Sequence, residues 1–176
     1  IAAQHSSFFD ALIPTILIGK YSGNVIPRHV LKSDLLLSPS LDIYGNRLPN
    51  QFINRGSKNS EQEVDGVRRL ADDLGSDALV IFPEGTRTND GNLQDAKSGV
   101  GFIIEKSKCV VIPAYIDGSF KSFSKNCKWI KPNKIKIIFG KPINNNNFLS
   151  LGEGKSSYDL YVNLIMRKIK EIRDAI

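Results

Sequence analysis

Hydrophobic positions along this chain of 176 residues follow two alternating patterns. Where apolar residues recur every three or four positions with charges between them, the spacing predicts an amphipathic helix. Where apolar residues follow one another without interruption, the run is typical of a strand buried on both faces. The predicted helices are residues 61–74, 98–106 and 158–176. The predicted strands are residues 51–54, 78–82, 110–116 and 135–139.

The order strand, helix, strand across residues 78–116 indicates a βαβ unit with parallel strands. The sequence therefore predicts an α/β fold, a single domain in which helices flank a largely parallel or mixed central sheet. In open sheets of this kind, ligands gather at the carboxyl ends of the strands. The turn that follows Phe82 lies at such an end.

Composition narrows the class of protein. With 41% hydrophobic and 24% charged residues, the chain is typical of a globular protein. Its longest apolar run, residues 11–19, is about half as long as a bilayer-spanning helix and contains Pro14, so we expect no membrane span here. Cys109 and Cys127 cannot form a disulfide scaffold, and with two histidines they argue against a structural zinc site. This cysteine usage favours a reducing, cytosolic compartment.

The formal net charge of +6 favours an anionic partner, such as nucleic acid, an anionic lipid surface or a phosphorylated metabolite. No acidic residue lies between Asp117 and Glu153. That segment holds lysines and large apolar residues: Lys121, Lys125, Lys128, Lys131, Lys134, Lys136, Lys141, Phe120, Phe123, Trp129 and Ile130. Lysine interleaved with aromatic residues suits a membrane interface. The alternative interpretation is a solvated basic face.

His5 and Asp10 form an HxxxxD pattern, the first candidate for chemistry. A histidine accepts a proton near neutral pH, and a carboxylate on its other ring nitrogen fixes the tautomer. Residues five apart lie about 140° apart on a helix, so the pair can meet only if His5 is in the preceding loop. The alternative is that Ser7 and Asp10 form a capping box, with Ser7 as N-cap and Asp10 at the third helical position.

Two further segments offer polar groups at strand ends. In residues 82–88, FPEGTRT, a buried strand ends in a tight turn followed by Arg87, whose planar guanidinium matches phosphate. Glu84 could position substrate groups or simply tie the turn together. Arg55 follows the predicted strand at 51–54 and is a second candidate phosphate ligand, or an exposed loop arginine. Pro113 interrupts an apolar strand, which could border a slot for an acyl chain or serve packing alone.

Together these segments resemble the 1-acyl-sn-glycerol-3-phosphate acyltransferase family, part of the glycerolipid acyltransferase superfamily. The family has four blocks, and this sequence holds a counterpart of each in order. They are residues 5–10 (HSSFFD), 52–55 (FINR), 82–87 (FPEGTR) and 111–114 (VIPA). The resemblance spans residues 1–142, which we expect to be the acyltransferase catalytic core. Residues 143–176, an asparagine-rich loop and a C-terminal amphipathic helix, are expected to belong to the same domain.

The resemblance implies acyl transfer from a thioester, acyl-CoA or acyl carrier protein, to the free hydroxyl of a lysophospholipid. On that model His5 is the general base and Asp10 orients it. Pro113 helps to shape the acyl site, and the acceptor's glycerol phosphate is held by Arg55, Glu84, Gly85, Thr86 and Arg87. The reaction requires no cofactor and no metal. The expected location is peripheral, on the cytoplasmic side of a membrane, with an anionic membrane surface as partner and with a membrane-anchoring segment conceivable before residue 1.

Some positions depart from the family pattern. Gln4 stands where asparagine is usual before the histidine, and Pro49 stands where glycine often opens the second block. Three other functions remain open: transfer to a different lysolipid acceptor, a catalytically silent lipid-binding relative, and a basic nucleic-acid-binding module. The last is motivated by charge alone and leaves His5 and Glu84 unexplained, so we expect no nucleic-acid partner.

Overall fold

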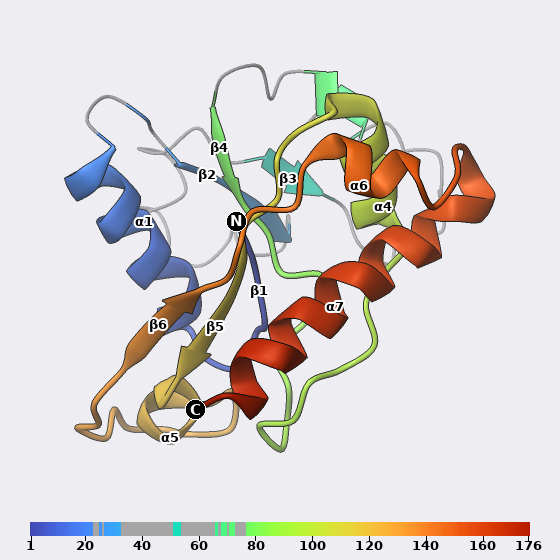
Figure 1. Ribbon diagram of the computed structural model, residues 1–176. Coiled ribbons are helices and arrows are strands. Elements are labelled where there is room, and N and C mark those ends of the chain that lie inside the picture. Colours follow the sequence, from blue (N-terminus) through green and yellow to red (C-terminus); the bar gives the residue numbers. More distant parts are fainter. Residues whose placement is uncertain are drawn as a thin grey trace.

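The computed structural model describes residues 1–22, 25, 27–32, 51–53, 66, 68–69, 71–72 and 77–176. Its strands are β1 (Ala2–Ala3), β2 (Pro27–Lys32), β3 (Gln51–Ile53), β4 (Ala78–Val80), β5 (Pro113–Asp117) and β6 (Lys136–Phe139). Its helices are α1 (Phe9–Tyr21), α4 (Gly99–Ser107), α5 (Ser119–Phe123), α6 (Asn145–Leu149), the 3-10 helix η2 (Lys155–Ser157) and α7 (Tyr158–Asp174). Figure 1 shows the strands in the middle of the molecule, with α7 on one side of β5 and α1 on the other.

The described strands form two three-stranded sheets, which together make one largely parallel array. In one part β2 pairs in parallel with both β3 and β4, and in the other β5 pairs in parallel with β1 and antiparallel with β6. A parallel bridge between Ala2 and Ile81 joins the two parts. Thus β4 and β5 are parallel, as the βαβ pattern predicted, and β1 lies between them. The prediction of a largely parallel or mixed sheet flanked by helices is confirmed.

Helices cover both faces of the sheet at β1. Ala2 and Ala3 are both fully buried, and successive residues of a strand point to opposite faces. Ala2 belongs to the main core cluster, which α4, α6 and α7 supply, whereas Ala3 packs in a second cluster that includes Ile13 of α1. A strand that is covered on both faces in this way has room only for small side chains, which is why alanine suits both positions.

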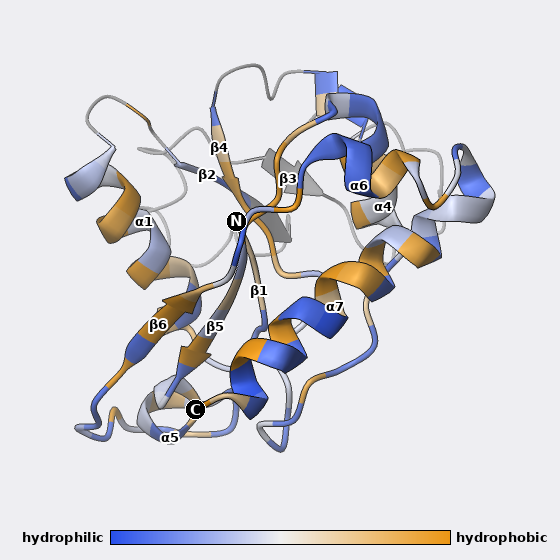
Figure 2. Ribbon diagram, in the orientation of Figure 1, coloured by the Kyte–Doolittle hydropathy of each residue, from blue (hydrophilic) through white to orange (hydrophobic). Residues whose placement is uncertain are grey.

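The amphipathic pattern of the C-terminal helix explains the larger core cluster. Four residues of α7 are buried: Tyr161, Val162, Ile165 and Ile169. Figure 2 shows hydrophobic and hydrophilic residues alternating along α7, with the hydrophobic ones on one side of the helix. The predicted helix at residues 61–74 is helical wherever the structure describes it, at positions 66, 68–69 and 71–72. In the described part of the chain, no helix is both long and apolar enough to span a bilayer.

Candidate active site

The candidate site lies where three parallel strands end. His5 follows β1, Glu84 follows β4, and α5 follows β5, so all three segments emerge at the carboxyl edge of the sheet. The sequence predicted this edge from the turn after Phe82. One step before His5, the side-chain amide of Gln4 exchanges two hydrogen bonds with the backbone of Ile116.

His5 is held in place by contacts on several sides. Its ring stacks on the ring of Phe82, with centroids 4.0 Å apart and planes inclined by 11°. Its carbonyl oxygen accepts a hydrogen bond of 2.8 Å from the backbone N–H of Thr88. Its Nδ1 lies 3.5 Å from Oδ2 of Asp10 and makes no hydrogen bond within the described residues. The side chain keeps 20% of its surface exposed, so the ring is fixed in orientation and still accessible.

Asp10 lies beside His5, as the first interpretation of the HxxxxD pattern requires, and it makes part of the contacts of the predicted capping box. Its carboxylate is fully buried, and Oδ2 accepts hydrogen bonds from the backbone N–H groups of Ser6 (2.5 Å) and Ser7 (2.6 Å). These bonds order the loop that carries His5 and place Oδ2 beside the imidazole. The helix begins one residue later than predicted, because Phe8 occupies the N-cap position and Asp10 is the second helical residue. The Ser7 hydroxyl still accepts a hydrogen bond of 3.2 Å from the backbone N–H of Phe9.

The turn after β4 buries a carboxyl group. Glu84 has 1% of its surface exposed, and burial raises the pKa of its carboxyl to about 7. The side-chain N–H of Gln94 donates to Oε2 of Glu84 and to the carbonyl of Thr86, both at 3.2 Å, and this contact lowers the pKa in part. Gly85 closes the turn by donating its N–H to the Phe82 carbonyl at 3.0 Å, with a φ of 74° that favours glycine.

Arg87 emerges from this turn half-buried. Within the part of the chain that the structure describes, no carboxylate lies within ion-pair distance of its guanidinium, in contrast to Arg28, which pairs with Asp77 at 2.6 Å. Thr86, just before it, is exposed. A guanidinium in this state has donors that could match a carboxylate or a phosphate.

Of the remaining two predicted residues, the structure describes only Pro113, and it lies away from this turn. Arg55 is outside the described residues; β3, which ends at Ile53, runs parallel to β2 and β4. Pro113 is buried at the start of β5, opposite Ala2, three residues before the Ile116 that Gln4 contacts. The structure therefore brings together His5, Asp10 and the turn at 84–87, and it does not bring Pro113 to them.

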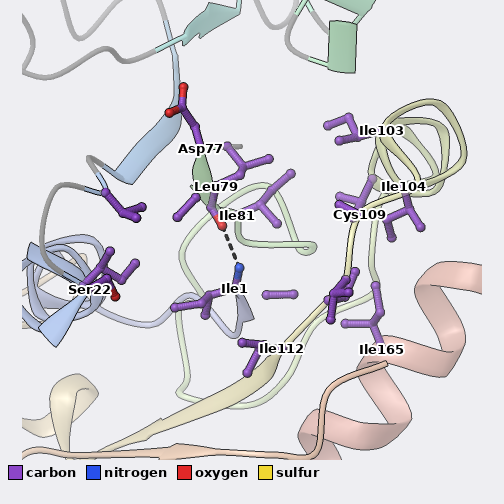
Figure 3. A pocket seen from close by; sticks show the side chains of 17 residues that line it. Ile1, Ser22, Asp77, Leu79, Ile81, Ile103, Ile104, Cys109, Ile112 and Ile165 are labelled. Atoms are coloured by element: carbon purple, nitrogen blue, oxygen red, sulfur yellow. Dashed lines mark hydrogen bonds between the residues drawn. The ribbon is translucent and has the colours of Figure 1, made fainter. Parts of the chain in front are cut away.

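An apolar cavity of about 250 Å³ lies at the opposite, amino ends of β1 and β4 (Figure 3). Leu79, Ile103 and Ile112 are among its walls, and the nitrogen of Ile1 donates to the Leu79 carbonyl at 2.6 Å beside it. The apolar segment before Pro113 therefore borders an apolar space, although Pro113 is not part of its lining.

Sequence reasoning missed three polar residues that build the site. Gln94 is ten residues from Glu84 in the sequence. Ser119 is 113 residues from Ser6, and the hydroxyl groups of these two residues lie 3.0 Å apart. Gln4 was noted as a departure from a family pattern and not as a structural contact. None of the three belongs to a spaced motif, so a single sequence held no signal for Gln94 or Ser119.

Residues 1–117 match the model of the acyltransferase family. A 1-acyl-sn-glycerol-3-phosphate acyltransferase from Cocos nucifera is 25% identical over 142 residues, which make up 80% of this chain and 44% of that protein. One from Limnanthes alba is 30% identical over 71 residues, or 40% of this chain and 25% of that protein. The chain thus spans less than half the length of these curated relatives.

The fold is also similar to a solved structure. The crystal structure of the 1-acyl-sn-glycerophosphate (LPA) acyltransferase PlsC from Thermotoga maritima superposes with a TM-score of 0.71 and 24% sequence identity. The match covers 98% of this chain and 65% of that one. At this level of identity the likeness establishes a shared fold.

Proposed function

Because this chain belongs to the acyltransferase family, we propose that it transfers a fatty acyl group from a thioester to the free hydroxyl of a lysophospholipid. The acceptor we infer is 1-acylglycerol-3-phosphate, which would give phosphatidic acid, and the donor is acyl-CoA or acyl carrier protein. One observation carries the proposal. His5, accessible and 3.5 Å from the buried Asp10, lies at the same sheet edge as the turn that holds Glu84 and Arg87. The names of the curated relatives support the choice of acceptor.

In the proposed reaction His5 is the general base. Asp10 faces Nδ1, so Nε2 is the nitrogen that takes the proton of the acceptor hydroxyl. The hydroxyl oxygen attacks the thioester carbonyl, the carbon–sulfur bond breaks, and the proton passes from His5 to the departing thiolate. A positioned base contributes roughly 10²- to 10⁴-fold to such a step. The distance between Nδ1 and Oδ2 is 3.5 Å, and we expect it to shorten when substrate binds. Catalytic hydrogen bonds are commonly long in the absence of substrate and become shorter in the complex.

The acceptor's phosphate would be held by Arg87, which has a guanidinium without a carboxylate partner in the described residues, and by Arg55. Glu84, Gly85 and Thr86 would form the wall of that phosphate site. We retain Pro113 as part of the proposed acyl site through its place beside the apolar segment at 111–112. Neither a metal ion nor a covalent enzyme intermediate is needed for this transfer. The protein would work as a peripheral protein on the cytoplasmic side of an anionic membrane.

The test is release of free thiol from acyl-CoA, with and without lysophosphatidic acid, for wild type and His5→Ala. We expect acceptor-dependent release that falls at least about 100-fold in the variant, with an unchanged circular dichroism spectrum. A second donor arm uses acyl carrier protein on anionic vesicles. A variant with near wild-type turnover would overturn the assignment of His5. Vesicle binding by the wild type without turnover from either donor would indicate a silent lipid-binding relative instead.

A further inference from the structure

We propose that residues 124–134, here called the lysine loop, dock this protein on an anionic lipid bilayer by inserting Trp129 and Ile130. The loop connects α5 to the segment that leads into β6. The inference rests on the proposed function in one respect, since a lysophospholipid acceptor resides in a bilayer. It adds the specific surface, the side chains that insert, and their connection to the loop of His5.

The first observation is exposure. Trp129 has 81% of its surface exposed and its neighbour Ile130 has 63%, and Trp129 is the most exposed large hydrophobic residue in the described part of the chain. Trp places an apolar ring and a polar N–H at one site, which suits the interface between water and lipid. Two adjacent exposed apolar side chains of this size indicate a partner surface.

The second observation is charge, and it selects the partner. The exposed lysines on the loop or flanking it are Lys121, Lys125, Lys128, Lys131, Lys134 and Lys136. None of them forms an ion pair within the described residues, and residues 118–152 contain no Asp or Glu. Unpaired lysines attract an anionic lipid surface, and inserted Trp and Ile require an apolar interior below it. A nucleic acid would match the charge alone.

The third observation is that the loop has a closed base. Ser122 and Lys131 exchange two hydrogen bonds, from the Lys131 N–H to the Ser122 carbonyl at 2.8 Å and from the Ser122 hydroxyl to the Lys131 carbonyl at 2.9 Å. The side chain of Asn133 donates to the Gly118 carbonyl at 2.7 Å. Trp129 and Ile130 therefore project from a structured base, so inserting them requires little additional ordering of the backbone.

The same base contacts the loop that carries the candidate catalytic residues. The Ser7 hydroxyl donates to the Phe123 carbonyl at 2.7 Å, and the rings of Phe9 and Phe123 lie 5.9 Å apart. At the other end of α5, the hydroxyl of Ser119 lies 3.0 Å from that of Ser6. Docking through the lysine loop therefore places the loop of His5 on the bilayer side, where an acceptor need not leave the membrane.

The experiment compares binding to vesicles of phosphatidylcholine with phosphatidylglycerol and to vesicles of phosphatidylcholine alone, by co-sedimentation. The insertion variant is Trp129→Ala with Ile130→Ala. Its control is Leu151→Ala with Leu160→Ala, two exposed apolar residues at or just before the start of α7, the end of that helix that lies far from α5 (Figure 1). The charge variant replaces Lys125, Lys128 and Lys131 with Gln. Its control makes the same replacement at the exposed Lys106, Lys155 and Lys170, so that both lose three charges.

We expect the insertion variant to bind anionic vesicles about tenfold more weakly or worse, given the apolar surface that it loses. The charge variant should lose its preference for anionic vesicles, and both controls should bind like wild type. Wild-type binding by the insertion variant would overturn the proposal, as would equal losses in the two charge variants. Loss in the charge variant alone would show adsorption without insertion and would also overturn it.

Activity provides a second readout that separates this inference from the proposed function. On acceptor presented in vesicles, the insertion variant should lose turnover in parallel with binding. On a short-chain acceptor dissolved below its critical micelle concentration, it should remain within about twofold of wild type, and an equal loss on both acceptors would contradict docking. If the wild type turned over neither acceptor, the proposed function would fail while vesicle binding would still decide the docking surface.

Discussion

The side-chain amide of Gln4 pairs with the backbone of Ile116 as another strand residue would. Its Nε2 donates to the Ile116 carbonyl at 2.7 Å, and its Oε1 accepts from the Ile116 N–H at 3.0 Å. Backbone pairing between β1 and β5 covers Ala2 and Ala3, so the amide extends the contact by one step. The backbone of residue 4 is thereby free to turn away from the sheet, immediately before His5.

We expect Gln4→Ala to lower the free energy of unfolding by about 2 kcal/mol or more, because it leaves two buried backbone groups of Ile116 without partners. The free energy of unfolding of Gln4→Asn should lie between those of wild type and Gln4→Ala. A side chain shorter by one methylene cannot reach both the N–H and the carbonyl of Ile116 with good geometry. Urea unfolding of the three proteins measures the difference. Equal midpoints and slopes would show that Ile116 finds other partners.

A second prediction concerns the buried carboxyl of Glu84. Its pKa of about 7 in the fold exceeds the ordinary value of 4.5, so between these pH values the folded protein holds a proton that the unfolded chain has released. The stabilisation is present below pH 4.5 and is lost as the pH rises through about 7. Relative to Glu84→Gln, the wild type should lose up to about 3 kcal/mol over this range.

The measurement is the difference in unfolding free energy between wild type and Glu84→Gln at a series of pH values. The contribution of His29 to stability changes with pH in the opposite direction over part of this range, because burial lowers its pKa to about 4. Both proteins carry His29, so its contribution cancels in the difference. A difference that stays constant from pH 4.5 to 8 would contradict the raised pKa of Glu84.

These residues show which parts of the molecule a single sequence could predict. The apolar runs predicted β4 and β5, and helical spacing predicted α7, because each is long enough for its pattern to emerge. β1 is two alanines and α5 is five residues, which is too short for any periodicity. The HxxxxD pattern is local in sequence, so its contact could be anticipated. The contacts that hold it, from Ile116 and Ser119, depend on strand order and could not.

In the candidate site, too, the features that are local in sequence could be predicted and those that depend on tertiary packing could not. The turn at 82–87 could be placed at a strand end because the strand before it was recognisable. The burial that raises the pKa of Glu84 could not be predicted, since it depends on how the turn packs against the loop of His5 and on Gln94. For Pro113 the sequence predicted an interruption within a strand at 110–116, whereas in the structure β5 begins at Pro113. The separation of Pro113 from His5 emerged only with the register of β5 against β1.

The guanidinium of Arg87, which has no carboxylate partner among the described residues, leads to a prediction about acceptor choice. Arg87→Ala should lower kcat/KM for lysophosphatidic acid roughly 10- to 100-fold, the effect expected from losing hydrogen bonds to a charged group. For a monoacylglycerol, which has no phosphate, the loss should be several-fold smaller. Lys97→Gln is the matched control, because its backbone N–H contacts the same turn at Pro83 and its side chain is exposed. Losses of equal size for both acceptors would rule out a phosphate contact.

The last prediction tests how closely α4 packs against the start of α7. A Cβ added at Gly101 would lie 2.5 Å from the carbonyl oxygen of Tyr158 and 2.6 Å from its Cα, so the two backbones are too close for any side chain. Gly99, two residues earlier in the same helix, has no atom within 4 Å of such a Cβ. Replacing either glycine with alanine removes the same backbone freedom, but only the replacement at Gly101 places a methyl group against a neighbouring backbone.

We expect Gly101→Ala to destabilise the protein by about 2 kcal/mol or more, since neither backbone can move without disturbing the core around Tyr161. Gly99→Ala should be neutral or stabilising by less than about 1 kcal/mol, because alanine is the better helix former. Chemical unfolding of both variants measures this. If the two variants unfolded alike, the close approach of α4 to the start of α7 would not be a fixed feature of the fold, because only a backbone able to yield would accept the methyl group at Gly101.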